Sequence, residues 1–448
     1  MKKIIAALLM FVMAMPLLAQ KKITLDEAVS IALQRNTSLI KTKNNLSSSK
    51  SQLKNAYGEL IPTFAGQGQW SWQRVNDIGG TQRDFFGNEV LVEASEVDSR
   101  SYSLGLGGNV TLFDGLANIA NISQKQDNLK SVEYSIEKKK QDVVYDATNY
   151  FYQVLNAGEL QRVREDNVKY YQKFYETVQE RNRLGSVAKA DVYTAQVQLG
   201  NAELLLIQAQ NDYQTSLSNL LNYLGLDVLE EYILVDPYAS QGSPDTESYL
   251  KEFDDMRAMV NAALDNRFDF KSQQLTVSSA KSGLTIARSG LLPNLTGNYS
   301  YYSNATKPEN LFDRKVLSIS LTLNLPIFSN WSTENQIELA QVNLKNAQED
   351  LLALERLVKI EVKQGYLDLV AAKKSLEVAS KNVTAAEETR KINQERYNLG
   401  SGTILDILQA DRDYTDALRN KINALYDFYT KRDKLNNVLG KLEYKKFE

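Results

Sequence analysis

The sequence predicts a mainly α-helical chain with a small β part, built from two tandem structural repeats. Three observations support this prediction. The same short motifs occur in the same order in both halves of the 448 residues. Each half contains two stretches in which apolar and polar residues alternate. Each half then continues into about 70 residues without proline, with an apolar or small residue at most seventh positions.

The first residues predict an exported protein. Lys2 and Lys3 precede an apolar stretch that Pro16 interrupts, and Ala19 offers a small residue for cleavage. This is the pattern of a secretory signal peptide over residues 1–19, with a short membrane anchor as the alternative. No later stretch approaches the roughly 20 apolar residues of a transmembrane helix. Any membrane that the mature chain crosses must therefore be crossed by strands.

The composition argues against catalysis and against metal binding. The chain has no cysteine and no histidine, which removes disulfides, the commonest general base and the commonest metal ligand. Only Met256 and Met259 remain beyond the signal segment, so a thioether-lined metal path is not expected. We expect no enzyme activity, no catalytic residues, no cofactor and no metal. The net charge of −3 gives no indication of nucleic-acid binding.

The two repeats cover residues 20–225 and 256–440. Leu60-Ile61-Pro62 recurs as Leu291-Leu292-Pro293, and the segment from Arg181 to Ser186 recurs from Arg396 to Ser401. Between Pro62 and Phe113 the first repeat carries about sixteen extra residues, which predict a longer loop. Residues 226–255 form a connector with nine acidic residues and one lysine, predicted to be partly structured and to lie as a belt near the helices. Residues 441–448 form a C-terminal tail.

Each repeat begins with a helix and continues into a β-hairpin. Thr24 and Glu27 predict a capping box for a helix that runs toward Pro62. The hairpins are predicted at residues 63–113, with the second strand starting at Ser101, and at residues 294–326. Alternation over about ten residues is typical of strands that span an outer membrane, although two soluble hairpins on a core are the alternative. An aromatic girdle is predicted at Trp70, Trp72, Tyr299 and Tyr301, together with Tyr302.

Each hairpin is followed by a long helix of about 70 residues, or roughly 105 Å. The seven-residue repeat predicts coiled-coil packing. In the second half it occupies Ile337, Leu344, Leu351, Val358, Gly365, Ala372, Ala379 and Ala386; in the first half it occupies Ile122, Leu129, Ile136, Val143, Tyr150 and Ala157 before Arg164 interrupts it. Gly185 and Gly400 then fit the left-handed position at a helix end, where the chain turns into a returning helix.

Four strands per chain cannot close a barrel, because barrels of a single chain begin at eight strands. An open sheet edge in lipid leaves backbone groups unpaired at several kcal/mol each. Two copies would give eight strands around a filled interior, whereas three give twelve strands and leave room for a channel. We therefore expect a homotrimer, with a 12-stranded transmembrane β-barrel that continues into a coiled-coil α-helical barrel.

The chain resembles the TolC family of outer-membrane efflux proteins in the order of its motifs. This order, which occurs twice, is a helix, Leu-Ile-Pro, strands, a long helix and an Arg-x-x-Leu-Gly tip, and Leu-Phe-Asp-Gly stands at residues 112–115. The resemblance covers essentially the whole mature chain. It implies a channel in the outer membrane of a Gram-negative bacterium, surrounded by outer-membrane lipid and extending into the periplasm as a tunnel. It also implies a partner periplasmic adaptor (membrane fusion) protein and an inner-membrane pump of the RND, ABC or MFS type, with export of small molecules or polypeptides.

The resemblance also implies site residues at the tip of the tunnel. Tyr397 matches the family's linking tyrosine, Asp191 its aspartate partner and Asp406 the first aspartate of the constriction. Gly402 stands where the best-known members have a linking arginine, and Gln409 where they have a second aspartate. We therefore expect the bond from Tyr397 to Asp191 to carry more of the closure, and Tyr397→Phe to raise resting conductance. The alternative for Asp406 is a solvated carboxylate at a helix start.

The adaptor-docking tips are predicted at Leu184, Gly185, Ser186, Leu399, Gly400 and Ser401. A competing function is a structural or adhesive coiled-coil outer-membrane protein without transport. A passive diffusion porin would not need helices of roughly 100 Å. The sequence does not indicate the exported substrate or the class of pump.

Overall fold

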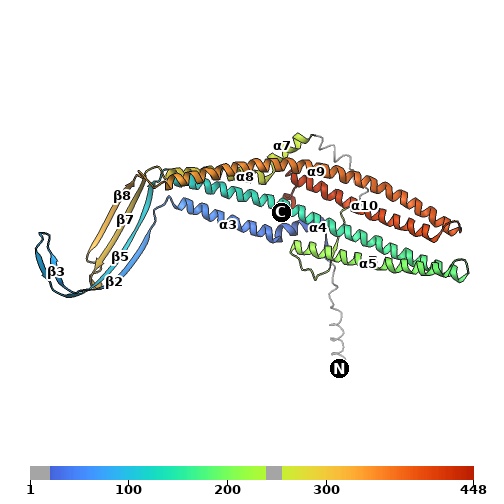
Figure 1. The fold of residues 1–448 in the computed structure, drawn as a ribbon, viewed down its shortest axis with the longest axis horizontal. Coiled ribbons are helices and arrows are strands. Elements are labelled where there is room, and N and C mark those ends of the chain that lie inside the picture. The colour runs from blue at the N-terminus through green and yellow to red at the C-terminus, as the bar shows by residue number, and fades with distance from the viewer. Residues whose placement is uncertain (1–20, 239–254, 448) are drawn as a thin grey trace, which may run out of the picture. The chain divides into compact units, whose positions relative to one another are not determined.

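The computed structural model describes residues 21–238 and 255–447 (Figure 1). The predicted signal peptide and residues 239–254 of the connector lie outside these ranges. The chain forms two compact units. The first comprises the described residues of Met1–Asn45, Glu133–Lys271 and Leu352–Glu448, and the second comprises Leu46–Val132 and Ser272–Leu351. Each unit therefore contains segments of both sequence repeats.

In both repeats, two consecutive helices precede the strands of the sheet. These are α2 (Leu25–Arg35) with α3 (Thr37–Gly58), and α7 (Met256–Asn266) with α8 (Phe268–Ser289). The capping box is confirmed, because Glu27 N donates to Thr24 Oγ1 and Thr24 N donates to the Glu27 carboxylate. The prediction of one continuous helix was wrong. Asn36 interrupts it with ψ at 117°, and its side-chain oxygen accepts the N–H groups of Ser38 and Leu39, as a new N-cap does.

The second unit contains a four-stranded antiparallel sheet in the order β2-β5-β7-β8. Its strands are β2 (Ala65–Asp77), β5 (Ser95–Phe113), β7 (Asn294–Ala305) and β8 (Lys315–Asn324). Both predicted hairpins are present, and pairing of β5 with β7 joins the two repeats into one sheet. One side of β2 and one side of β8 remain unpaired in the described chain.

The two faces of this sheet differ in polarity, as the alternation predicts. One row runs through Gly66, Leu106, Tyr301 and Leu317, and a row on the other face runs through Asn109, Asn298 and Ser320. The apolar side chains of β8 have no cover within the chain: Leu317, Ile319, Leu321 and Leu323 are between 67% and 75% exposed.

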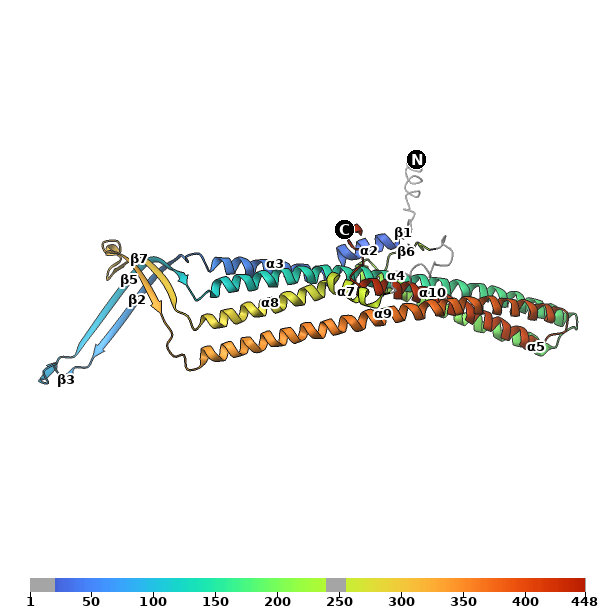
Figure 2. The same cartoon turned by 90° about the horizontal axis from the view of Figure 1, so that it is seen from above.

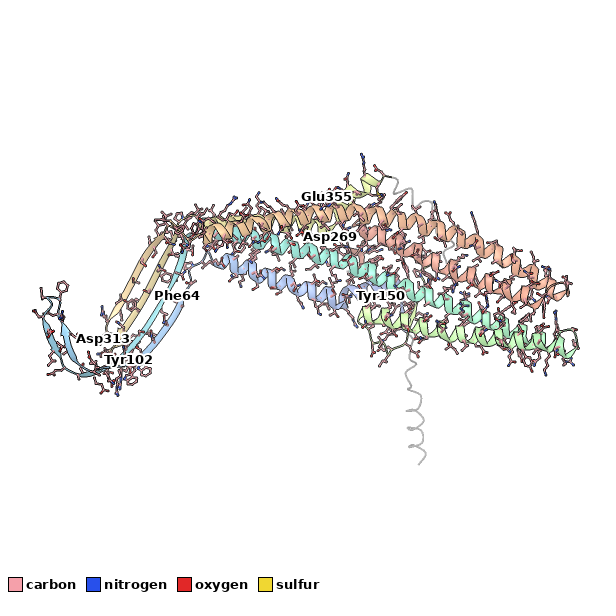
Figure 3. All side chains as sticks on the ribbon, in the orientation of Figure 1. Phe64, Tyr102, Tyr150, Asp269, Asp313 and Glu355 are labelled. Carbon is pink, nitrogen blue, oxygen red and sulfur yellow. The ribbon has the colours of Figure 1, made fainter. Side chains whose placement is uncertain are left out.

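The strand register shows on which face of the sheet, and at which level, each residue of the predicted aromatic girdle lies. Tyr302 pairs with Gly105 and Val316, so it lies on the polar face and its assignment to the girdle was wrong. Trp70 pairs with Tyr102 of β5, which Figure 3 labels, whereas Tyr301 pairs with Leu106 of the same strand. Tyr102 and Leu106 are four residues apart, so Trp70 and Tyr301 lie at levels about 13 Å apart along β5. The girdle of Trp70, Trp72, Tyr299 and Tyr301 stays a prediction.

The extra residues of the first repeat form more than a loop. A small antiparallel hairpin of β3 (Gly80–Arg83) and β4 (Glu89–Val92) stands between β2 and β5. Strand β5 begins at Ser95, six residues before its predicted start at Ser101. In the second repeat, the corresponding interval holds only the short helix η1 (Pro308–Asn310).

The predicted long helices are α4 (Ala117–Arg183) and α9 (Ser332–Asn398), of 67 residues each. They return as α5 (Lys189–Leu224) and α10 (Ile404–Val438), which lie beside them in the first unit (Figures 1 and 2). Tyr150 of α4 (Figure 3) packs its ring 4.9 Å from that of Tyr223 on α5. None of the described helices is both long and apolar enough to span a membrane.

The seven-residue repeat of α9 is a buried seam in the first unit. Buried positions alternate in spacing between three and four residues, as in a coiled coil. They are Val358, Val362, Gly365, Leu369, Ala372, Leu376, Ala379 and Val383. Gly365 permits a close approach of α10, because a Cβ there would lie 3.3 Å from Leu435 Cδ1.

The described part of the connector and the C-terminal tail both pack on the helices of the first unit. Strand β6 (Tyr232–Leu234) pairs in parallel with β1 (Lys21–Ile23), and Tyr238 stacks on Tyr429 of α10 at 4.2 Å. The tail contains η2 (Lys445–Phe447), and the buried Tyr444 donates a hydrogen bond to Glu137 of α4.

Candidate channel tip

Two glycine turns close the helical hairpins. Gly185 and Gly400 have φ of 78° and 76°, which confirms the predicted left-handed positions. At the first turn, Ser186 N donates to Arg181 O at 2.8 Å and Gly185 N donates to Asn182 O at 2.9 Å. The same pair of bonds occurs at the second turn, so both helices end in a Schellman motif. Identical turn chemistry presents Leu184 and Leu399 at the two tips, where Leu399 is 83% exposed.

A small apolar core lies behind the turns and contains residues of all four helices. Tyr397 of α9 is 7% exposed and packs with Phe174 of α4, their ring centres 5.9 Å apart. The other buried members of this core are Tyr171, Val178, Ala195, Ala202 and Ile407. The first and second hairpins are therefore held together near the tip by apolar contacts.

Tyr397 and Asp191 form no hydrogen bond within a single copy of the chain, so the predicted bond was wrong for the single chain. The buried Tyr397 hydroxyl has no hydrogen-bond partner among the described residues, and burial raises its pKa. The Asp191 carboxylate instead accepts the N–H of Ala188 at 3.3 Å, where it caps the start of α5. A carboxylate at this position satisfies free backbone donors at a helix N-terminus.

Arg181 of α4 is the link that sequence reasoning missed. Its guanidinium lies 4.9 Å from the ring centre of Tyr397, and Nη2 donates to Asn398 Oδ1 at 3.2 Å. A cation therefore joins the first hairpin to α9, although position 402 has a glycine in place of the arginine that the resemblance implies. Gly402 leaves little room for a side chain, since a Cβ there would lie 3.2 Å from Tyr397 N. The signal was available, because Arg181 opens the Arg-x-x-Leu-Gly motif of the first tip.

Asp406 and Gln409 both face outward near the start of α10. Asp406 accepts hydrogen bonds from Thr403 N and Thr403 Oγ1, each at 2.9 Å, and the backbone bond holds the pKa of its carboxyl below the usual range. Gln409 donates to Asp413 at 2.7 Å within the same helix. Asp406 thus has the helix-start role that was the alternative. Its role in a constriction requires other copies of the chain and stays a prediction.

Long helical hairpins with glycine tips, together with a four-stranded sheet that has one apolar face and two open edges, define the class of outer-membrane channel subunits. The outer membrane efflux protein family matches residues 28–226 and 259–441, and the chain belongs to this family. Members of the family are outer-membrane efflux channels, and hence transporters.

Individual relatives are similar to this chain in sequence or in fold. Protein CyaE of Bordetella pertussis is 24% identical over 369 residues, which cover 78% of this chain and 76% of that protein. Outer membrane protein TolC of Vibrio cholerae is 25% identical over 312 residues, or 68% of each chain. The crystal structure of the Campylobacter jejuni CmeC outer membrane channel matches with a TM-score of 0.77 at 17% identity, over 94% of this chain and 86% of that one.

Proposed function

We propose that three copies of this chain form one continuous export duct, with a 12-stranded barrel in the outer membrane and the helices in the periplasm. The observation that carries the proposal is the four-stranded sheet with two unpaired edges and an uncovered apolar face. In lipid, the edges of β2 and β8 must pair, and the edge of one copy can pair with the other edge of the next copy. Three copies supply enough strands to enclose a lumen.

The helices supply a second, independent argument for assembly. A stripe on α5 carries Tyr193, Val197, Leu204 and Ile207, spaced to share one helix face, and each is exposed in the single chain. On α9, Leu357, Ile360, Leu367 and Val378 are likewise exposed. A row of exposed apolar side chains along one face of a helix is typical of a surface that another protein chain covers. Packing between copies would cover both stripes and extend the tube away from the membrane.

We further propose that the glycine tips dock onto a periplasmic adaptor protein coupled to an inner-membrane pump. Both repeats present Leu-Gly-Ser at the turn, with the leucine exposed. The relatives include a toxin and drug export protein of Aggregatibacter actinomycetemcomitans and a pyoverdine export protein of Pseudomonas aeruginosa. We propose that the cargo is a small molecule or a polypeptide, and that the pump is of the RND, ABC or MFS type that the resemblance implies.

Native mass spectrometry and single-channel recording test the duct. We expect a trimer after detergent extraction and discrete conductance steps in a planar bilayer. A stable monomer or dimer without any trimer would contradict the assembly. Trimers without conductance would favour the structural or adhesive function instead.

Substitution of the tip glycines tests the docking. Replacing Gly185 and Gly400 by Trp should abolish efflux in a host that lacks its own duct, while trimers still reach the outer membrane. The matched control replaces both by Asn, which tolerates the left-handed conformation and adds less bulk. Retained efflux in the Trp variant would exclude the tips as the docking surface.

A further inference from the structure

A groove in the first unit is lined by α4 and by the two returning helices, α5 and α10. Its volume is about 710 Å³, and the lining residues of α4 and α10 nearest the tip are Arg164 and Arg419. Both arginines, together with Leu205 of α5, also line an adjoining hollow of about 520 Å³. Two cationic side chains from different repeats therefore stand where the two hollows meet.

Arg164 is a partly buried cation without a paired carboxylate. Its side chain forms no hydrogen bond or ion pair with any residue that the structure describes. Burial and repulsion by Arg419 lower the pKa of its guanidinium, and attraction to Asp416 offsets this only in part. Asp416 itself lies 3.4 Å from Arg419, and both of these side chains are about half exposed. The three charged side chains at this end of the groove thus carry one net positive charge.

The sequence repeat shows that the helices do not require these two arginines. At the constant offset that aligns the two tip glycines, Arg164 corresponds to Ala379 and Arg419 corresponds to Leu204. Ala379 belongs to the buried seam of α9, whereas Arg164 interrupts the matching seam of α4. Equivalent helices therefore form with aliphatic residues at both positions. The arginines call for another explanation than folding.

Apolar side chains line the groove next to the arginines, on the side away from the tip. They are Ala157, Leu160 and Val163 of α4 with Leu205 and Ala209 of α5. Ala157 and Arg164 are seven residues apart, or roughly 10 Å along the helix. Two fused aromatic rings fit into such a length. An apolar surface thus leads directly to a pair of cations.

The far end of the groove has the opposite charge. Asp212 of α5 stands seven residues beyond Leu205, and Asp427 of α10 stands eight residues beyond Arg419, roughly 10–12 Å along the helices. Both carboxylates are exposed. They disfavour a second negative charge at this end of the groove. A ligand that matches the whole groove therefore has one anionic end and an uncharged body.

We propose that the groove binds an amphipathic organic monoanion, whose carboxylate or sulfonate lies between Arg164 and Arg419 and whose apolar body lies along α4 and α5. A guanidinium group binds such oxygens with several donors in a fixed geometry. An anion between the two arginines relieves the repulsion between them. The volume is in the range of small-molecule sites. This site goes beyond the proposed duct, because binding is measured whether or not the protein conducts.

Titration calorimetry with naphthalene-2-sulfonate tests the site on the full-length protein in a non-ionic detergent. We expect saturable binding, and Arg164→Gln and Arg419→Gln should each weaken it about tenfold, because each removes charge-assisted hydrogen bonds. The matched control is Arg162→Gln, which makes the same change in net charge. Arg162 is exposed on α4, 3.9 Å from Glu159 of the same helix. This control should bind the sulfonate like the wild type.

Two related compounds test the chemistry of the ligand. 2-Naphthalenemethanol has the same rings without the charge, and it should bind about tenfold more weakly than the sulfonate. Naphthalene-2,6-disulfonate directs a second anionic group toward Asp212 and Asp427, so it should also bind more weakly than the monoanion. If the uncharged alcohol binds as tightly as the sulfonate, the arginines are not the anchor and the proposal is overturned.

A cysteine reporter locates the ligand without changing either arginine. The chain has no native cysteine, and Ala209 lines the groove. Saturating naphthalene-2-sulfonate should slow the reaction of Ala209→Cys with a maleimide several-fold. The control is Gln210→Cys, at the next and exposed position of α5, which should react at an unchanged rate. This measurement keeps the proposal testable if the arginine variants do not fold.

The outcomes separate the binding site from the duct. The site is overturned by the absence of saturable binding, by equal affinity in Arg164→Gln and Arg162→Gln, or by the same labelling of Ala209→Cys with and without the sulfonate. An Ala209→Cys that never reacts shows that another copy of the chain covers the groove, which overturns the site as well. A protein that binds the sulfonate and never conducts retains the site and contradicts the duct.

Discussion

Replacing Tyr397 by Phe should stabilise the tip and leave the resting conductance unchanged. The substitution removes only a hydroxyl that is buried without a hydrogen-bond partner among the described residues. A buried unsatisfied polar group costs about 1–3 kcal/mol, so its removal should increase the free energy of unfolding by about 1 kcal/mol. The phenyl ring keeps its packing on Phe174 and its position under Arg181. This expectation is the reverse of the one drawn from the resemblance.

The assay compares Tyr397→Phe with Tyr397→Ala in thermal unfolding of the trimer and in bilayer recordings. Tyr397→Ala deletes the ring from the tip core, and truncation of a large buried aromatic costs about 3–5 kcal/mol. We therefore expect more opening from the alanine variant only. If Tyr397→Phe alone raises resting conductance, the hydroxyl has a partner in the assembled duct, and the reasoning from the single chain fails.

The remaining predictions concern charge at the tip. Arg181→Ala should raise the resting open probability about five- to tenfold, because the cation–π contact and the hydrogen bond that it removes are together worth about 1–1.5 kcal/mol. The control is Arg183→Ala, which removes a salt bridge with Glu180 within one helix. Equal conductance of the two variants would exclude Arg181 as a link between the hairpins. Asp406→Ala should reduce both the selectivity of the channel for cations and the inhibition of its current by multivalent cations. Thr403→Ala, which removes the hydroxyl of the helix cap but keeps the charge of Asp406, should change neither. Unchanged selectivity in Asp406→Ala would place the constriction elsewhere. Burial raises the pKa of the Asp411 carboxyl, which Arg390, Tyr171 and Asn167 face, so protonation favours the packed state. The free energy of unfolding should therefore fall as the pH rises through the folded-state pKa, and Asp411→Asn should lose this part of the pH dependence.

The contribution of Asp411 to the pH dependence of stability follows from the change of its pKa on folding. The folded-state pKa of Asp411 lies above its unfolded value, because burial disfavours the carboxylate. Its contribution to stability is therefore greatest below the unfolded pKa and declines as the pH rises through the folded pKa. Acid should therefore not destabilise the folded chain through this group. Thermal unfolding of the wild type and of Asp411→Asn, measured as a function of pH, tests this contribution; the same pH dependence in both proteins would contradict it.

Local and periodic features of the chain were determined by the sequence alone. The capping box at Thr24, the left-handed glycines at the tips and the seam of α9 each depend on residues within a few positions of one another. The recurrence of the motifs predicted the two repeats, and the uninterrupted segments predicted the long helices. These elements follow from backbone conformation and spacing, which a sequence displays directly.

Contacts between distant segments were decided only by the tertiary structure. Pairing of β5 with β7, the approach of Arg181 to Tyr397 and the burial of Asp411 against Arg390 and Asn167 join residues that are far apart in the chain, often in different repeats. Asp411 has the same local pattern as an exposed helix carboxylate, and Tyr397 the same pattern as a hydrogen-bonded tyrosine. Their environments depend on which helix faces pack together, and hydrophobic periodicity specifies that a face is buried without specifying its partner.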